Sequence, residues 1–225
     1  MTVATESPRL DVDAAARGAA YALFAAVSRH PTEELHGALE SGAFRADLSD
    51  LVDRTPLDVS VPVCTAVDDY DTLCARYNDV FVLGYSEYEN PMDGTLDTTE
   101  PPAPLYESAY RTDASWNDVN LDLARAYDYY GLSPDEDERQ HHDHLTLQLE
   151  FAGYLARREA TVDGEDAAAA RLDFLDRHLS VLVAGVTDRV RGEAGTGVYQ
   201  PLVCTLERLV ESERADLGAR LEGER

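Results

Sequence analysis

The sequence predicts a single-domain, all-α protein packed as a helical bundle. Apolar residues recur every three or four positions through most of the chain, which is the spacing of one face of a helix. No run of residues demands pairing as a β-strand, and no glycine-rich phosphate loop is present. The 225 residues are enough to bury one full core, with residues 1–9 and 213–225 as loose ends. We therefore expect roughly seven or eight helices.

Two helices with clear start signals open the chain. Asp11 is a suitable N-cap for a helix that ends before Pro31, and Thr32 caps a shorter helix that Gly42 closes. A third short helix is expected over residues 44–51.

The longest apolar seam follows. Its members are spaced by four and three residues, at Val63, Val67, Tyr70, Cys74, Tyr77 and Phe81. This spacing predicts a long amphipathic helix packed against other helices. Residues 57–61 before it alternate in polarity but have no partner strand, so we expect a linker there.

A polar segment covers residues 84–104. It is long for a structureless loop inside a compact domain, so it predicts a functional or mobile loop. Its end, PPAPLYESAY, combines three prolines that stiffen the backbone with Tyr106, Glu107 and Tyr110. Ser115 and Asp118 then have the spacing of a capping box. They open a helix that Gly131 ends, and further apolar stripes predict helices over residues 138–158, 172–190 and 199–210.

The charge balance restricts the partners. The formal net charge is −25, from 19 basic and 44 acidic residues, and every basic residue is arginine. Self-repulsion of this size destabilises a compact state in dilute buffer, whereas the screening length falls to about 3 Å at 1 M salt. We expect a halophilic protein, which circular dichroism at low salt would test. Nucleic acid and anionic membranes carry charge of the same sign and are disfavoured as partners.

The N-terminus lacks a basic region followed by an unbroken apolar run. No apolar stretch approaches the length of a membrane span. We therefore expect a cytoplasmic protein without a signal peptide.

The densest cluster of titratable side chains is His141, His142, Asp143 and His144, at the head of the core helix expected over 138–158. His141 and His144 would share a helix face and hold a metal, but the sequence offers no clear third ligand. An HD-type metal-dependent phosphohydrolase using this cluster is the alternative enzyme hypothesis. The structural alternative places the Asp143 carboxylate at the first helical turn, while His144 holds a neighbouring loop. With no Ser-His-Asp or Cys-His set indicated, we expect no enzyme, no metal and no cofactor.

Four segments resemble the TorD/DmsD family of cytoplasmic chaperones for molybdenum-containing oxidoreductases. They are AYALFAAVSRHPTEEL, YNDVFVLG with PLYESAY, DHLTLQLEF and FLDRHL. The resemblance runs from about Asp11 to Leu209. The chain departs from the family at His142, where a proline is usual, and in lacking the tryptophan that often follows the FLDRHL-like segment.

The resemblance implies the all-helical TorD/DmsD fold in its halophilic archaeal form, in a maturation chaperone that is monomeric or dimeric. The implied partner is the catalytic subunit of a molybdopterin oxidoreductase of the DMSO, TMAO or nitrate reductase type. Its twin-arginine leader or an early region would be bound, and the subunit held for cofactor insertion before export.

The resemblance also implies a set of client-binding residues in a groove between helices. Asp143 and Glu107 would pair with guanidinium groups of the leader. The apolar part of the client would be covered by Tyr77, Phe81, Tyr106 and Leu145. His144 would touch the client or hold the loop that contains Pro104.

Overall fold

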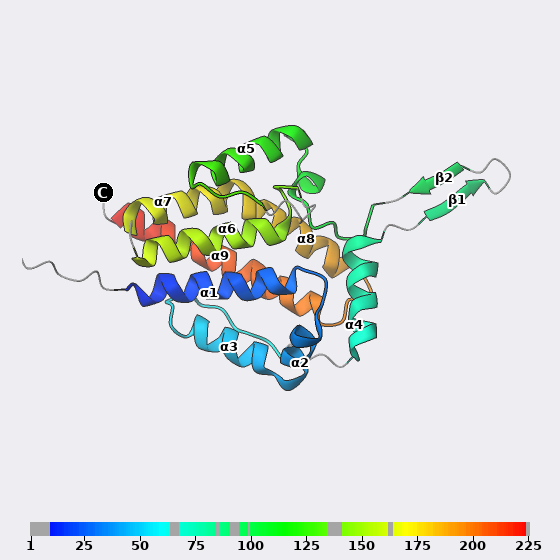
Figure 1. The fold of residues 1–225 in the computed structure, drawn as a ribbon, viewed down its shortest axis with the longest axis horizontal. Coiled ribbons are helices and arrows are strands. Elements are labelled where there is room, and N and C mark those ends of the chain that lie inside the picture. The colour runs from blue at the N-terminus through cyan, green and yellow to red at the C-terminus, as the bar shows by residue number, and fades with distance from the viewer. Residues whose placement is uncertain are drawn as a thin grey trace, which may run out of the picture.

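The computed structural model describes residues 10–63, 68–83, 86–90, 95–98, 100–134, 141–161 and 164–223, and most of them are helical. The α-helices are α1 (Val12–Val27), α2 (Glu33–Ser41), α3 (Ala43–Val52), α4 (Tyr70–Tyr77), α5 (Trp116–Tyr129), α6 (Leu145–Thr161), α7 (Gly164–Phe174), α8 (Ser180–Gly192) and α9 (Tyr199–Gly223). Two segments are π-helical: η1 (Asn78–Val82) continues α4, and η3 (Leu175–Leu179) joins α7 to α8. The 3-10 turn η2 covers Glu107–Tyr110. The predicted all-α class is confirmed (Figure 1).

The predicted caps start and end several helices. The side chains of Asp11 and Thr32 each accept a hydrogen bond from the backbone N–H three residues later, at 3.1 and 3.2 Å. Ser115 and Asp118 form the reciprocal capping box at the start of α5. Gly42 ends α2 with a φ of 77°, a conformation that glycine adopts without steric cost. Three polar side chains and one glycine therefore fix these helix boundaries as the sequence predicts.

The helix predicted over the long apolar seam is shorter than expected. Val63 is not helical, Cys64 and Val67 lie outside the described residues, and α4 begins only at Tyr70. Asp69 caps it by accepting a hydrogen bond at 2.8 Å from a backbone N–H of the first turn. Apolar spacing alone does not show where a helix begins inside a seam, because the spacing continues through residues that are not helical. Here the polar cap at Asp69 sets the start.

A β-hairpin occupies part of the segment expected to be a loop. Strands β1 (Ser86–Asn90) and β2 (Thr95–Thr98) pair antiparallel, with Glu87 opposite Asp97. In Figure 1 the hairpin projects from the helical body beside α4. The sequence does not predict it, because short polar strands lack the apolar alternation that is typical of a strand.

Helix α9 extends through most of the predicted C-terminal tail. It reaches Gly223, and Glu213 and Leu217 are fully buried, so the prediction of a loose end from residue 213 was wrong. Residues 1–9, the predicted N-terminal loose end, lie outside the described residues. Neither α9 nor any other helix in the described ranges is long and apolar enough to cross a membrane.

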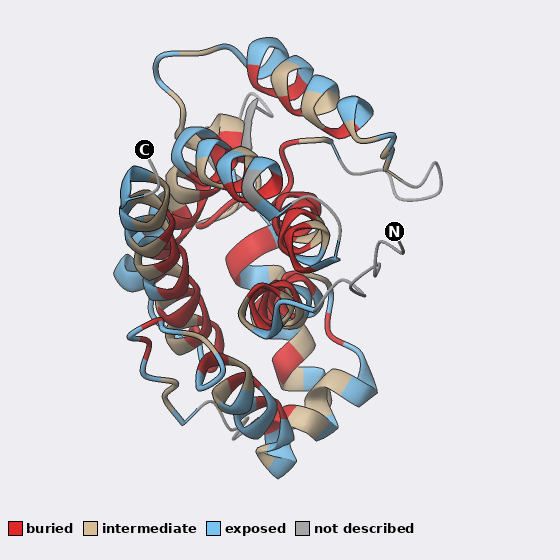
Figure 2. Cartoon of the chain, turned by 90° about the vertical axis from the view of Figure 1, so that its left-hand side faces the viewer, coloured by how far each residue is buried: buried red, intermediate tan, exposed pale blue. Residues whose placement is uncertain are grey.

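Helices α1 and α6 pack together at the centre of the fold (Figure 1). Their backbones cross closely at Gly18 and Gly153. A Cβ atom built at either glycine would lie 3.0 to 3.1 Å from the carbonyl oxygen of the other. Buried residues lie on the inward faces of the helices (Figure 2), and the buried apolar side chains form a connected cluster. The two glycines thus set the distance between the central helices.

A buried ionic cluster ties α1, α6, α7 and α9 together. We define it by Arg17, Tyr21, Glu159, Arg171 and Glu213, which are at most 7% exposed. Arg171 lies 2.6 Å from Glu159 and 3.0 Å from Glu213, and Tyr21 donates its hydroxyl hydrogen bond to Glu213. Burial and the nearby Glu213 carboxylate raise the pKa of Tyr21. One carboxylate, Glu213, therefore serves groups from two other helices.

Candidate functional site

An aromatic cleft of about 760 Å³ lies where η1, the proline-rich segment and the start of α6 meet. Its lining comprises His30, Tyr77, Asn78, Phe81, Val82, Glu100, Pro101, Pro104, Leu105, Tyr106, Ser108, Ala109, Trp116, His141 and His144. Five of these residues are predicted site residues: Tyr77, Phe81, Pro104, Tyr106 and His144. Segments far apart in the sequence thus contribute to a single cleft.

The two segments on which the sequence analysis placed the site are paired directly. Tyr106 and His144 form an antiparallel bridge between backbones. The Leu145 N–H donates to the Leu105 carbonyl at 2.8 Å, and the Glu107 N–H donates to the Asp143 carbonyl at 3.0 Å. The rings of Tyr106 and His144 meet edge to face, 4.9 Å apart between centroids. Backbone pairing therefore fixes the position of the Tyr106 ring at the cleft.

Asp143 and His144 exchange the two structural roles that the sequence predicts for them. His144 directly precedes α6, and its Nδ1 accepts a hydrogen bond from the Thr146 N–H at 3.2 Å. Asp143 instead holds the neighbouring loop, because its Oδ2 accepts from the Ser108 N–H at 3.1 Å. Helix α6 begins at Leu145, so His141 and His144 do not share a helix face, and Glu138 lies outside the described residues.

His144 makes the stability of the protein depend on pH. Burial lowers the pKa of its imidazole to about 4, and protonation would also remove the acceptor of the Thr146 N–H. Between pH 6.5 and pH 4 the unfolded chain binds the extra proton, so stability falls as pH falls, by about 3 kcal/mol from this group. In His144→Asn, which retains a capping acceptor, we expect this part of the pH dependence to disappear from denaturant titrations. Identical pH profiles for the two proteins would contradict the assignment.

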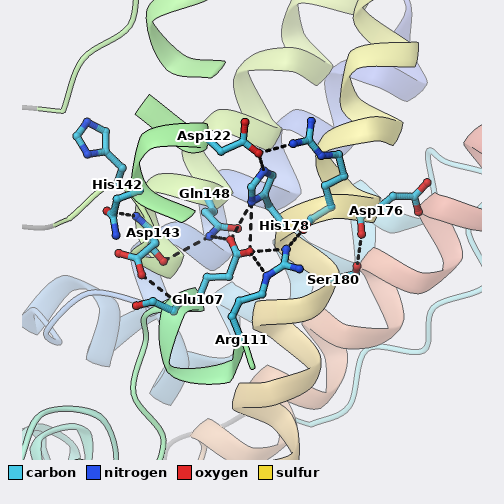
Figure 3. A network of polar contacts seen from close by, with 12 residues as sticks. Glu107, Arg111, Asp122, His142, Asp143, Gln148, Asp176, His178 and Ser180 are labelled. Carbon is cyan, nitrogen blue, oxygen red and sulfur yellow. Dashed lines mark hydrogen bonds and ion pairs between the residues drawn. The ribbon is translucent and has the colours of Figure 1, made fainter. Parts of the chain in front are cut away.

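Glu107 lies behind the cleft in a polar network (Figure 3). Its carboxylate, 0% exposed, accepts hydrogen bonds from Arg111 and Gln148, each at 2.8 Å, and faces Nδ1 of His178 at 3.1 Å. Asp143 is equally buried. The resemblance implies that these two carboxylates pair with guanidinium groups of the leader. In the structure both are enclosed by the protein. Leu145, also buried, packs in the core instead of lining the cleft.

The other wall of the cleft is a stack of aromatic rings. Tyr77 lies 5.3 Å from Phe81 and 5.5 Å from His30, measured between ring centroids. The Tyr77 hydroxyl donates to the Ser28 carbonyl at 3.0 Å, and burial raises its pKa to about 12. The hydroxyl therefore stays neutral and occupied, so this wall offers mainly ring surface.

Several lining residues were not predicted from the sequence. Trp116, the first residue of α5 and 47% exposed, meets the His141 ring edge to face at 5.0 Å. Glu100 is also among the residues that line the cleft. The described ranges contain no group of three or more His, Cys, Asp or Glu side chains placed to hold a metal ion. The phosphohydrolase hypothesis would require such a group.

Gly185 of α8 supports the cleft from behind. A Cβ atom at this position would overlap the ring of Tyr110, whose hydroxyl donates to the Pro104 carbonyl at 2.8 Å. We expect Gly185→Ala to destabilise the protein by about 1 to 3 kcal/mol and to displace the proline-rich segment. Gly192→Ala in the same helix meets no atom within 4 Å and is the matched control. Equal melting temperatures for both variants would show that Tyr110 yields at no cost.

A second cavity of about 560 Å³ lies between α1, α6 and the segment after α5. It is lined in part by Arg29, Tyr127, Leu132 and Glu150 and contains none of the predicted site residues.

The fold and the cleft have the character of a binding protein: ring surfaces face the cleft, and the carboxylates behind it are engaged in structural hydrogen bonds. The chain belongs to the protein family described as "Nitrate reductase delta subunit", which it matches over residues 43–188.

Three curated relatives extend this assignment. The chain is 38% identical over 51% of its length to the selenate reductase assembly chaperone protein of Thauera selenatis, and this match spans only 61% of that relative. It is 35% identical to the chlorate reductase assembly chaperone protein of Ideonella dechloratans, over 66% of this chain and 72% of the relative. It is 24% identical to the perchlorate reductase assembly chaperone protein of Dechloromonas aromatica, over 90% of both chains. The relatives are named as chaperones and not as enzymes, in agreement with the sequence analysis.

Proposed function

We propose that this protein is a cytoplasmic assembly chaperone that binds the catalytic subunit of a molybdopterin-containing oxidoreductase and holds it for cofactor insertion. The family and the names of the three relatives support this function. The observation that carries it is the aromatic cleft, in which the PLYESAY and Asp-His segments pair and present ring surface. The proposed client is a reductase of the DMSO, TMAO or nitrate type that the resemblance implies, or one of the oxyanion reductases that the relatives' names describe.

The chemistry of the cleft supports a client segment that is mainly apolar. Four aromatic side chains, Tyr77, Phe81, Tyr106 and Trp116, line it beside three imidazoles. The guanidinium groups of a twin-arginine leader would lie over ring faces and near Glu100, because Glu107 and Asp143 are enclosed. Apolar burial would then supply most of the affinity, and charge pairing less in concentrated salt.

The net charge of −25 supports a protein that functions in a salt-rich cytoplasm. We expect it to unfold on transfer to low-salt buffer, which circular dichroism measures. Whether the chaperone acts as monomer or dimer follows from light scattering in the same buffer.

Trp116 provides the assay for the proposed function. It is the only tryptophan in the chain and lies half-exposed in the cleft, so a bound segment that covers it will shift its fluorescence to shorter wavelength. Tryptophan-free peptides from the N-terminal regions of the host's molybdopterin reductase subunits serve as probes, and peptides of the same composition in scrambled order as controls. We expect saturable binding of at least one native peptide. If native and scrambled peptides bind alike, leader recognition by the cleft is wrong.

A further inference from the structure

Glu107 connects the cleft to η3, the π-helical segment between α7 and α8. It follows Tyr106 directly, and its buried carboxylate contacts three side chains from different parts of the chain. Arg111 lies one turn later in the chain, Gln148 belongs to α6 and His178 belongs to η3. The bridge to His144 holds the backbone of Tyr106. The side-chain contacts of Glu107 hold η2, which follows directly in the chain.

His178 is aimed at Glu107 by an irregular helix. Residues 164–192 form a continuous helix, α7–η3–α8, whose middle turn is π-helical. An extra residue in one turn rotates the following side chains by about 100° relative to the preceding ones, and such turns are frequent at functional sites. Nδ1 of His178 faces Glu107 at 3.1 Å and Nε2 faces Asp122 of α5 at 3.3 Å (Figure 3). The imidazole thus spans the space between η2 and α5.

Asp122 links His178 to α5, whose first residue lines the cleft. Helix α5 begins with Trp116, which lines the cleft, and carries Asp122 on its second turn. Arg177, next to His178, also contacts Asp122. His178 therefore lies between the elements that carry Tyr106 and Trp116.

We propose that His178 and Glu107 are positioning residues for client recognition. They hold η2 and α5 in place. Together with the backbone bridge to His144, this keeps the Tyr106 ring in the orientation that the client meets. This inference rests on the proposed function, because it assumes that the aromatic cleft binds the client. Neither residue lines the cleft, so their effect on binding is indirect.

A double-mutant cycle tests the proposal with the native peptide identified by Trp116 fluorescence. We expect His178→Ala to weaken peptide binding about fivefold or more when Tyr106 is present. In the Tyr106→Ala background the same substitution should change binding by less than about twofold, since the ring that it positions is gone. A role in stability alone would weaken both backgrounds equally. His36→Ala is the matched control, because His36 contacts the Asp68 carbonyl and does not line the cleft.

The outcomes separate the two claims. If Tyr106→Ala binds peptide as the wild type does, the proposed site is wrong whatever His178 does. If Tyr106→Ala weakens binding but the effects of the two substitutions multiply, the positioning role is overturned and the site stands. Should His178→Ala fail to fold by circular dichroism, the isosteric Glu107→Gln replaces it in the cycle. If that variant also unfolds, the network is structural and the proposal is overturned.

Discussion

Replacing Glu213 with alanine is expected to lower the free energy of unfolding by about 3 to 5 kcal/mol. The carboxylate is 0% exposed and lies among Tyr21, Arg17 and Arg171, from helices α1 and α7. Its removal leaves two buried guanidinium groups with less compensating charge, and breaking a buried pair costs far more than breaking one at the surface. Chemical denaturation of the wild type and the variant measures the loss.

Glu207→Ala is the matched control for this prediction. Glu207 also lies on α9 and also pairs with an arginine, Arg191, at 2.5 Å, but that arginine is 46% exposed. Removing this pair should cost less than about 1 kcal/mol, and the cost should shrink further in concentrated salt. The Glu213 effect should persist in salt because water and ions do not reach the cluster. Similar losses for the two variants would contradict the assigned role of the buried ionic cluster.

Replacing Tyr106 with alanine is expected to weaken binding of the native leader peptide about ten- to a hundredfold. Tyr106 lines the cleft, its ring is half-buried against His144, and its backbone is held by pairing to the same residue. Truncation therefore removes apolar surface available to the client, and within the described residues it removes no hydrogen bond of the Tyr106 side chain. A buried aromatic contributes about 1.5 to 3 kcal/mol, which corresponds to this range of affinity.

The control for Tyr106 is a tyrosine on the open surface. Tyr129 of α5 is 83% exposed and lies outside the cleft, so Tyr129→Ala should leave the peptide affinity unchanged. Both variants are titrated by Trp116 fluorescence under conditions in which circular dichroism shows native helix content. An unchanged affinity in folded Tyr106→Ala would remove this ring from the binding site.

Much of the helical framework could be predicted because local signals determine it. Asp11, Thr32 and the Ser115 capping box act within one turn of the chain, so the sequence alone reveals them. The late start of α4 at Tyr70 and the hairpin could not be predicted from apolar spacing. Both depend on polar residues whose pairing has no periodic signal.

The pairing of two segments of the candidate site could be anticipated from the sequence, and the burial of their carboxylates could not. The PLYESAY and Asp-His segments do meet, and this was expected from their resemblance to a family and not from spacing. That Glu107 and Asp143 are enclosed follows only from the tertiary packing of α6 and η3 around them. His178 had a signal, because it lies within the apolar stripe of residues 172–190, where a titratable side chain needs a buried partner.

The crossing of α1 and α6 at Gly18 and Gly153 limits how the body of the protein can change shape. Backbones in such close contact leave no room for one helix to slide or roll over the other. The central pair therefore behaves as a fixed spine. If the cleft binds client segments as proposed, their different sizes must be met by side chains at the cleft, because the proline-rich segment is itself held to the start of α6 by backbone hydrogen bonds.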